Sequence, residues 1–505
     1  MQTAIIAFQS LLIIPIVAFP LIYLIGRVTK RITQKNGKSY NPSQILSLLV
    51  IASLFYPAII VFRHVQTVSD IYFQIGQITM QMNAAAIFLV MIVVPITFLV
   101  VLFSGQYMRG ETGEEKYYAF LVYMIGMIIG LSTTTDLFNL WVWFEAFAIT
   151  PYVLVAFYHD RAEVLEAGVK YLLQSAVGTL FVLAGITILF MNTGTLNLMQ
   201  LRAMEITAEP EIILCATFFV IGFGVKSALV PLHTWLPDAH SQAPSGISAI
   251  LSGIVIETAL LTMTRILSVV NIAFVSLGSI LIASGMLNMI VGNLMALKQN
   301  NVKRMLAFSS ISHMGYIIFG IGISEISGNP LGLQGSLFHI LTHAMMKSLS
   351  FMIIGALMMG FEGIKGDAHS PLVKDDLNGL SRRNRGLALF FSIALLSLAG
   401  IPPLGGFMSK GVILYAGIET GNPWIIGCVI FAALNSVLSL GYYAPLINRM
   451  YRTHVPPSNK RFLAPNKSMV FVFLVLAIGL VVLGFLPGIV GDFSLPATFL
   501  LSGLQ

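Results

Sequence analysis

Two stretches of the chain, GFGVKSALVPLHTWLP (residues 222–237) and GIPPLGGFMSK (residues 400–410), each place a lysine beside glycine and proline within an apolar run. Proline removes a helical hydrogen bond and clashes with the preceding turn, so each stretch predicts a break in a helix. Freed backbone groups at membrane depth are tolerated only where protein or a water-filled cavity surrounds them. We therefore expect two broken membrane helices, each with its lysine near mid-membrane.

The composition of the whole chain indicates a membrane protein. Of its 505 residues, 57% are hydrophobic and 10% are charged, and the mean hydropathy is +0.87, whereas soluble proteins carry roughly 25% charged residues. The formal charge of +7 would suit nucleic acid, but the basic residues lie in short loops with no accompanying aromatic surface. We expect contact with the lipid bilayer and none with nucleic acid.

A spanning helix needs about 20 mostly apolar residues, and this rule predicts about 14 spans. Their approximate limits are 4–26, 42–63, 83–104, 117–134, 137–157, 165–191, 211–231, 244–264, 270–297, 301–323, 333–360, 386–418, 423–448 and 468–490. The alternation of polar and apolar residues over 64–82 predicts a short hairpin outside the membrane, with a surface loop as the alternative.

The two broken spans also indicate an internal repeat. When spans 4 to 8 are superposed on spans 9 to 13, the broken seventh span corresponds to the broken twelfth. Because five is an odd number, the two blocks face opposite ways, which is typical of ion-coupled transporters. We predict an all-α polytopic membrane protein of about 14 helices with two inverted five-helix repeats. Its parts are helices 1–3 (residues 1–116), the first repeat (117–264), the second repeat (270–451) and a C-terminal helix (468–505).

The basic residues outside the spans predict the orientation. Of the 28 lysines and arginines, 21 lie in loops after odd-numbered spans and 3 in loops after even-numbered spans. The positive-inside rule then places both termini on the outer side. No nucleotide-binding or HExxH motif occurs, and both cysteines, Cys215 and Cys428, lie in apolar runs. We therefore expect no redox centre, cofactor or metal of the chain's own.

Six ionisable residues fall inside predicted spans, where each costs roughly 3 kcal/mol or more unless it is paired, hydrated or neutral. They are Glu145, Lys170, Lys226, Glu257, Lys347 and Lys410. Glu145 lies well inside its span, although an end residue that reaches the interface is the alternative. If Glu145 and Lys226 pair, both stay charged, and a pair that can form and break acts as a proton switch.

The other polar positions predict a proton path. Glu257 is either a proton relay or a protonated acid with one interhelical hydrogen bond. His339, His343 and Lys347 recur at i, i+4 and i+8, so they share one helix face. Interhelical hydrogen bonding and metal binding are the alternatives for this face. We favour a proton path, because a free imidazole titrates near neutrality.

Two further lysines have two interpretations each. Lys303 opens the tenth span beside Arg304, so it is either an anchor at the membrane surface or a member of the path. Lys170 lies near the start of the sixth span and can extend to the cytoplasmic surface, with a place in the path as the alternative.

Several motifs together resemble one family: PLHTWLPDAHSQAP (231–244), NNVKRMLAFSSI (300–311), the histidine-lysine face of the eleventh span and GIPPLGGFMSK. They are similar to the antiporter-like membrane subunits of proton-pumping NADH-quinone oxidoreductase (respiratory complex I). The family also includes subunits of energy-converting hydrogenases and of Mrp-type Na+/H+ antiporters. The resemblance covers residues 80 to 450 approximately and implies a 14-helix fold in which each inverted repeat contains a broken helix.

The resemblance implies a proton-translocating subunit of a redox-driven respiratory complex, working with other membrane subunits in a prokaryotic cell membrane. The alternatives are a subunit of a Mrp-type antiporter, with Na+ in place of H+, or of a membrane-bound hydrogenase. In the family pattern Glu145 matches the glutamate of the fifth helix, Lys226 the lysine of the broken seventh helix, and Lys410 the corresponding position of the broken twelfth. Glu257 departs from the pattern, because the family usually has lysine there; this departure implies an altered relay, an altered ion choice or a loss of pumping.

Overall fold

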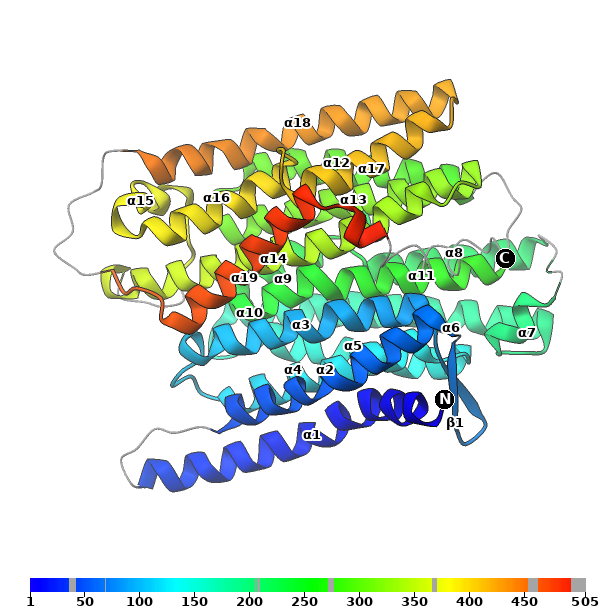
Figure 1. Cartoon of the computed structure of the whole chain (residues 1–505), viewed down its shortest axis with the longest axis horizontal. Coiled ribbons are helices and arrows are strands. Elements are labelled where there is room, and N and C mark those ends of the chain that lie inside the picture. Colours follow the sequence, from blue (N-terminus) through cyan, green and yellow to red (C-terminus); the bar gives the residue numbers. More distant parts are fainter. Residues whose placement is uncertain are drawn as a thin grey trace. The chain divides into compact units, whose positions relative to one another are not determined.

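The computed structural model describes residues 1–35, 42–68, 70–204, 206, 209–270, 277–365, 370–452 and 462–491. The predicted C-terminal part, 468–505, lies partly outside these residues, as does the start of the predicted span 270–297. The chain divides into two compact units, and Figure 1 labels their helices and strands. Unit 1 contains residues 1–227 and 258–270 of the described chain, and unit 2 contains 228–257 and 277–491.

Unit 1 is a bundle of long helices. α1 packs against α2 and α4, α3 packs against α2 and α4, and the contacts continue from α4 to α5, α5 to α6 and α6 to α8. The helices are α1 (Gln2–Lys35), α2 (Ser43–Thr67), α3 (Ala84–Tyr107), α4 (Glu114–Thr133), α5 (Leu137–Val155), α6 (Ala162–Thr193), α7 (Leu198–Arg202), α8 (Pro210–Lys226) and most of α11 (Ile256–Val270).

Local signals in the sequence set the helix ends of unit 1. The side chains of Asn83 and Asp136 accept hydrogen bonds from the backbone amides of Ala86 and Asn139, as N-caps do. α6 ends at Gly194, which adopts a φ of +71° and lets the chain turn away. The polar residues between the apolar runs therefore act as helix start and stop signals.

The hairpin predicted within 64–82 is confirmed. Strands β1 (Ile71–Ile75) and β2 (Ile78–Met82) pair antiparallel, with Ile75 opposite Ile78, and Gly76 has a φ of +61° at the turn. Asp70 precedes β1 and accepts a hydrogen bond from Gln81 at 2.7 Å. Burial raises the pKa of Asp70, and attraction to Arg202 of α7 lowers it, so the hairpin is electrostatically coupled to α7.

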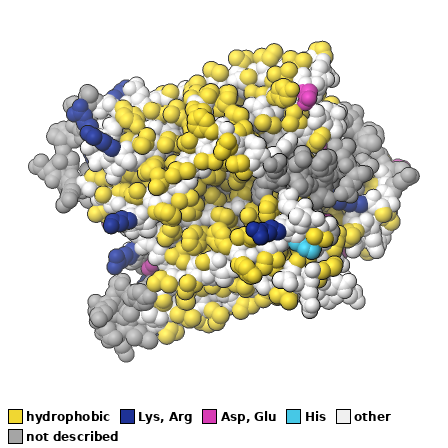
Figure 2. Space-filling model, viewed as in Figure 1, with side chains coloured by type: hydrophobic (Ala, Val, Ile, Leu, Met, Phe, Trp, Pro, Cys, Tyr) yellow, Lys and Arg dark blue, Asp and Glu magenta, His cyan; other side chains and the backbone are white. Residues whose placement is uncertain are grey.

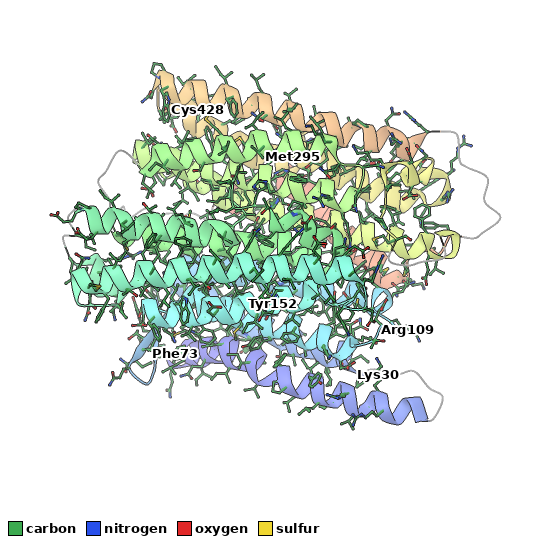
Figure 3. The ribbon with its side chains drawn as sticks, turned by 180° about the vertical axis from the view of Figure 1, so that it is seen from behind. Lys30, Phe73, Arg109, Tyr152, Met295 and Cys428 are labelled. Carbon is green, nitrogen blue, oxygen red and sulfur yellow. The ribbon has the colours of Figure 1, made fainter. Side chains whose placement is uncertain are left out.

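Lys30 and Arg109 lie at the end of unit 1 that is away from this hairpin. Figure 3 shows Lys30 and Arg109 at one end of the unit and Phe73 of β1 at the other. Lys30 donates a hydrogen bond to the carbonyl oxygen of Glu111 at 3.2 Å, which links α1 to the segment that follows α3. This distribution is the one that the positive-inside rule uses.

Unit 2 is built around two helices, α13 and α14, whose side chains are almost all buried. α12, α9 and α17 pack against α13, while α10, α16, α17 and α19 pack against α14. The helices are α9 (Trp235–Gln242), α10 (Ser245–Ile250), the π-helical turn η1 (Leu251–Val255), α12 (Leu277–Lys298), α13 (Val302–Ser327), α14 (Leu331–Lys365), the 3-10 turn η2 (Lys374–Leu377), α15 (Leu380–Arg383), α16 (Arg385–Ala399), α17 (Gly405–Glu419), α18 (Pro423–Tyr451) and α19 (Lys467–Phe485).

Both predicted helix breaks are confirmed. α8 ends at Lys226 and the helical conformation resumes only at Trp235, in α9. The second break separates α16 from α17 between Ala399 and Gly405, and Gly400 in it has a φ of +79°. Each lysine thus lies beside an interruption of the helical ladder.

Twelve helices of the described chain are long and apolar enough to cross a membrane, so the protein is an integral membrane protein with many spans. Hydrophobic side chains cover much of the visible surface (Figure 2). On α6 Leu173 is 60% exposed and Leu180 62%, as expected for side chains that face lipid. The sequence predicted about 14 spans; α8, α16 and α17, with 17, 15 and 15 residues, fall short of the length of a continuous span because of the breaks.

Glycines let α12 and α13 approach closely. Gly278, Gly285 and Gly292 recur every seven residues on α12, and a Cβ at Gly285 would lie 2.7 Å from the carbonyl oxygen of Gly315 on α13. Small residues bring membrane helices into van der Waals contact in this way.

We predict that Gly285→Val destabilises the protein, because the added side chain must push the α13 backbone away. The matched control is Gly427→Val on α18, where an added Cβ meets nothing within 4 Å. Overpacking costs about 1–3 kcal/mol, so the purified Gly285→Val protein should lose helical signal at a lower temperature than the control. Equal thermal stability of the two variants would contradict the close contact.

Candidate functional site

Lys226 is the centre of a buried polar cluster in unit 1. It is the last residue of α8 and only 1% exposed. Its ammonium donates hydrogen bonds to the hydroxyl of Tyr171 at 2.7 Å and of Ser175 at 3.3 Å, both on α6. It also lies 4.7 Å from the ring centroid of Tyr171 and 5.4 Å from that of Phe147. The negative end of the α8 dipole and these aromatic faces both favour a cation here.

Glu145 lies on α5, half-buried, and acts electrostatically on Lys226. No ion pair within 4.0 Å joins the two among the described residues, because Lys226 is bonded to Tyr171 and Ser175 instead. The structure therefore shows the two predicted partners within electrostatic range and not in contact. Lys170 differs from both, since it is 47% exposed on α6 and pairs with Glu166 at 2.7 Å.

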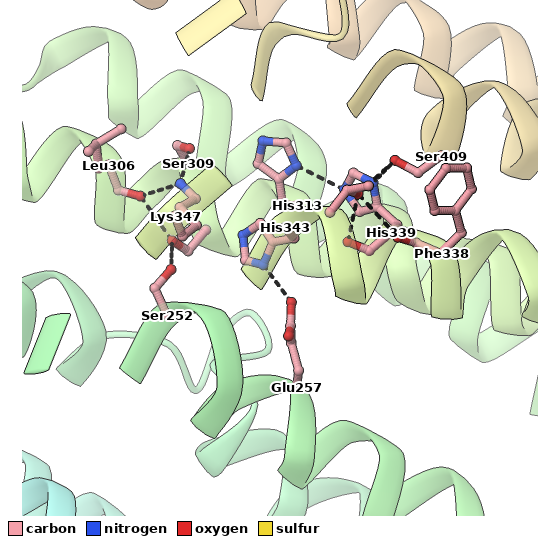
Figure 4. Close-up of polar contacts among 12 residues, drawn as sticks. Ser252, Glu257, Leu306, Ser309, His313, Phe338, His339, His343, Lys347 and Ser409 are labelled. Carbon is pink, nitrogen blue, oxygen red and sulfur yellow. Dashed lines mark hydrogen bonds and ion pairs between the residues drawn. The ribbon is translucent and has the colours of Figure 1, made fainter. Parts of the chain in front are cut away.

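Glu257 and His343 form a contact in unit 2 (Figure 4). Oε1 of Glu257 lies 2.6 Å from Nδ1 of His343, and both side chains are buried. Glu257 stands at the start of α11, directly after the π-helical turn η1, whereas His343 lies midway along α14. The sequence placed both residues in one path, and the structure brings them into direct contact.

A row of imidazoles continues from His343. The ring centroids of His343 and His313 are 5.1 Å apart. Nδ1 of His313 lies 3.0 Å from Nε2 of His339, and Nδ1 of His339 lies 2.8 Å from Oγ of Ser409 (Figure 4). Because each imidazole has one nitrogen that can donate and one that can accept, this row is able to relay a proton.

Lys347 joins the same row through two hydroxyl groups. Its ammonium donates to the carbonyl oxygen of Leu306 at 2.9 Å and to the hydroxyl of Ser309. Ser309 is hydrogen-bonded to Tyr443 of α18, whose hydroxyl lies 3.5 Å from Nε2 of His313. The hydrogen-bonded chain therefore runs from Lys347 on α14 to Ser309 on α13, then to Tyr443 on α18 and back to His313 on α13.

Lys410 is held by the second helix break. Its ammonium donates to the carbonyl oxygen of Leu398, in the last turn of α16, at 2.9 Å and to Ser436 at 3.2 Å. It lies 4.8 Å from the ring centroid of Tyr316. The break frees carbonyl groups at the end of α16, and the lysine satisfies one of them.

Lys303 and its neighbour Arg304 have different surroundings. Lys303 is 3% exposed and donates to the carbonyl oxygen of Ala243, between α9 and α10, at 2.7 Å. Arg304 is 41% exposed and pairs with Asp238 at 2.7 Å. The arginine is thus the residue with a surface position, and the lysine is a buried group of unit 2.

Sequence reasoning missed several members of these clusters. His313 was visible only as one polar residue of a serine-rich stretch, while Tyr171, Tyr443 and Ser409 gave no signal beyond their residue type. His240 of α9 is also buried, stacked on Phe351 at 4.8 Å, and neither of its ring nitrogens has a hydrogen-bond partner in the described part of the chain. Within the described ranges, no three histidine, cysteine or acidic side chains are grouped to hold a metal.

Comparison with known proteins shows which family this chain is similar to. The family model described as NADH:quinone oxidoreductase/Mrp antiporter, transmembrane, matches residues 134–436. Subunit N of NADH-quinone oxidoreductase from Desulforudis audaxviator (strain MP104C) is 32% identical over 401 residues, covering 76% of this chain and 77% of that protein. Subunit N of F(420)H(2) dehydrogenase from Methanosarcina mazei is 30% identical over 418 residues, covering 81% and 82%.

A solved structure shares the fold over nearly the whole length. A chain of the membrane-bound sulfane sulfur reductase, an archaeal respiratory membrane complex, superposes with a TM-score of 0.86 at 26% identity. The match covers 98% of this chain and 97% of that one.

We predict that Ser309→Ala destabilises the protein by about 1–3 kcal/mol, because it removes one buried hydrogen-bond partner from each of Lys347 and Tyr443. The matched control is Ser350→Ala on α14, since within the described chain the Ser350 hydroxyl bonds only to the carbonyl oxygen of Met346 in its own helix. Thermal unfolding of the purified variants tests the difference, and equal midpoints would show that the Ser309 contacts carry no net energy.

Proposed function

The chain belongs to the NADH:quinone oxidoreductase/Mrp antiporter membrane family, and from this premise we propose that it moves protons through its two buried lysine clusters. It is an antiporter-like membrane subunit of the type found in NADH-quinone oxidoreductase and related complexes. In this proposal electron transfer takes place in partner subunits, and this chain supplies a path for the ion.

The observation that carries the proposal is the chain of buried donors and acceptors in unit 2. Lys347, Ser309, Tyr443 and His313 follow one another within hydrogen-bonding reach. These groups are ammonium, hydroxyl and imidazole, which exchange protons. A hard cation such as Na+ prefers a shell of oxygen ligands, and among the described residues Glu257 is the one carboxylate in contact with the imidazole row. The chemistry of the row therefore favours H+.

In this proposal the cluster around Lys226 acts as the proton switch. Lys226 is bonded to Tyr171 and Ser175, and Glu145 acts on it from α5. If a change in a partner subunit draws Glu145 to Lys226, the ammonium is stabilised; if Glu145 withdraws, burial favours release of the proton. Each cycle of approach and withdrawal then takes up and releases a proton at Lys226.

We also propose the finer architecture that the family implies. α8 with α9, and α16 with α17, are the broken helices of two inverted repeats, 117–264 and 270–451, in a chain of 14 helices. A buried lysine near each break, Lys226 at the end of α8 and Lys410 within α17, supports this assignment. Residues 228–257, which this assignment gives to the first repeat, pack within unit 2.

We predict that Glu145→Gln and Lys226→Ala lower proton pumping by about tenfold or more, as loss of a proton-transfer group does. The assay is acidification or alkalinisation of sealed membrane vesicles that hold the assembled complex, driven by its electron donor. Lys116→Gln, at an exposed lysine near the start of α4, is the control. Pumping at the wild-type rate in both site variants would refute the proposed function, and sodium counterflow that persists without a redox donor would favour the antiporter alternative.

The proposed location is a prokaryotic cell membrane with both termini on the outer side. Cysteine labelling tests it, since both native cysteines are buried. In right-side-out vesicles a membrane-impermeant thiol reagent should label Gln200→Cys, at the end that carries few basic residues, and not Thr112→Cys, at the basic end. The reverse pattern would invert the topology.

A further inference from the structure

Glu257 is the residue that departs from the family pattern, and its local backbone departs from an ordinary helix. The π-helical turn η1 (Leu251–Val255) ends two residues before it. A π turn holds more residues than an α turn, so it changes the direction of every side chain that follows, and such turns are frequent at functional sites. The direction in which Glu257 points is therefore set by this turn.

Two contacts hold the π turn in place. A Cβ at Gly253 would lie 2.9 Å from Cα and 3.0 Å from the carbonyl oxygen of Ala344, the residue after His343. On the other side, Oγ of Ser252 lies 2.6 Å from Oγ of Ser310 on α13. The backbone of η1 thus lies directly against α14 at the position from which His343 projects.

The contact between Glu257 and His343 isolates the two groups as a pair. Their side chains are 1% and 0% exposed, and Oε1 and Nδ1 are 2.6 Å apart. The remaining atoms, Oε2 of Glu257 and Nε2 of His343, have no hydrogen-bond partner in the described chain. Each side chain therefore has the other as its polar partner, and one hydrogen between Oε1 and Nδ1 joins them.

With a hydrogen on Nε2 of His343, the pair is neutral whenever Oε1 and Nδ1 share one proton. With the proton on Glu257 both groups are uncharged; when it moves from Oε1 to Nδ1 they become a carboxylate and an imidazolium, and the sum stays zero. Loss of that proton, or gain of a second, leaves an uncompensated buried charge. A pair of this kind takes or gives a proton only when a neighbour gives or takes one.

The neighbouring groups are basic. His240 of α9, His339 and Lys347 of α14, and Lys410 of α17 act electrostatically on His343, and His313 of α13 lies beside it. A lysine in place of Glu257 would add a further cation to this group, whereas the carboxylate offsets one. The acid thus makes a proton on His343 compatible with the lysines around it.

We propose that Glu257 and His343 act as a single proton-sharing couple, held in register by the π turn at Gly253, which delivers protons one at a time to the row of His313 and His339. This inference rests on the proposed function and identifies the step of the path that this chain performs with a carboxylate. Glu257 and His343 touch the transferred proton, while Gly253 is a positioning residue.

The test uses infrared difference spectroscopy of the assembled complex together with proton pumping in vesicles. The wild type should show a carboxyl C=O absorption that changes with pH and is lost in Glu257→Gln, a variant of nearly unchanged shape. His343→Gln should retain this band but shift its pH dependence, and pumping should fall by about tenfold or more in both. Absence of a band that Glu257→Gln removes, or wild-type pumping in that variant, would overturn the couple.

The variants at Glu145 separate this inference from the proposed function. If Glu145→Gln stops pumping and Glu257→Gln does not, the couple is refuted and the function stands. If neither change affects pumping, the function itself is refuted.

Gly253→Ala tests the role of the π turn. The added methyl group must move η1 away from Ala344, so the band of Glu257 should shift in the same direction as in His343→Gln. The matched control is Gly278→Ala on α12, where a Cβ would lie 2.7 Å from the carbonyl oxygen of Gly322 in a similar helix contact. A band unchanged in Gly253→Ala, or shifted equally by both variants, would remove the π turn from the proposal.

Discussion

The structure depends on one constraint: a charged amine buried at membrane depth must find partners that water would otherwise supply. Lys410 finds them in the carbonyl group that a helix break leaves free at Leu398. Lys226 ends a helix at the other break and lies between hydroxyl groups and aromatic faces. At the second break the freed carbonyl group and the lysine therefore satisfy each other, whereas Lys226 at the first break is satisfied by side chains of α6.

The same constraint explains how much of the fold and site the sequence could predict. Proline and glycine beside a lysine in an apolar run have few stable arrangements, so both breaks were predictable to within a few residues. The hairpin followed from the alternation of polar and apolar residues over 64–82. The i, i+4 spacing placed His339 and His343 on one face of α14, since helical periodicity needs no tertiary information.

Contacts between helices were not predictable, because they depend on the rotation of each helix about its axis. Lys170 and Lys226 are both lysines of apolar runs, yet one faces the surface and the other a cluster of hydroxyl groups. The contact of Glu257 with His343 required a π-helical turn, for which the sequence has no simple signal. Tyr443 belongs to the site through its bond to Ser309, although the sequence of α18 gave no indication of this role.

Tyr443 links the buried site to a helix that is exposed at the surface of the chain. Its hydroxyl completes the link between Ser309 and His313, and it belongs to α18, a helix on which Leu434 is 64% and Val437 63% exposed. One face of α18 is thus exposed at the surface of the chain, while Tyr443 of the same helix makes a hydrogen bond of 3.5 Å. Since hydrogen bonds weaken steeply with distance, a small displacement of α18 by the surrounding bilayer would break this link.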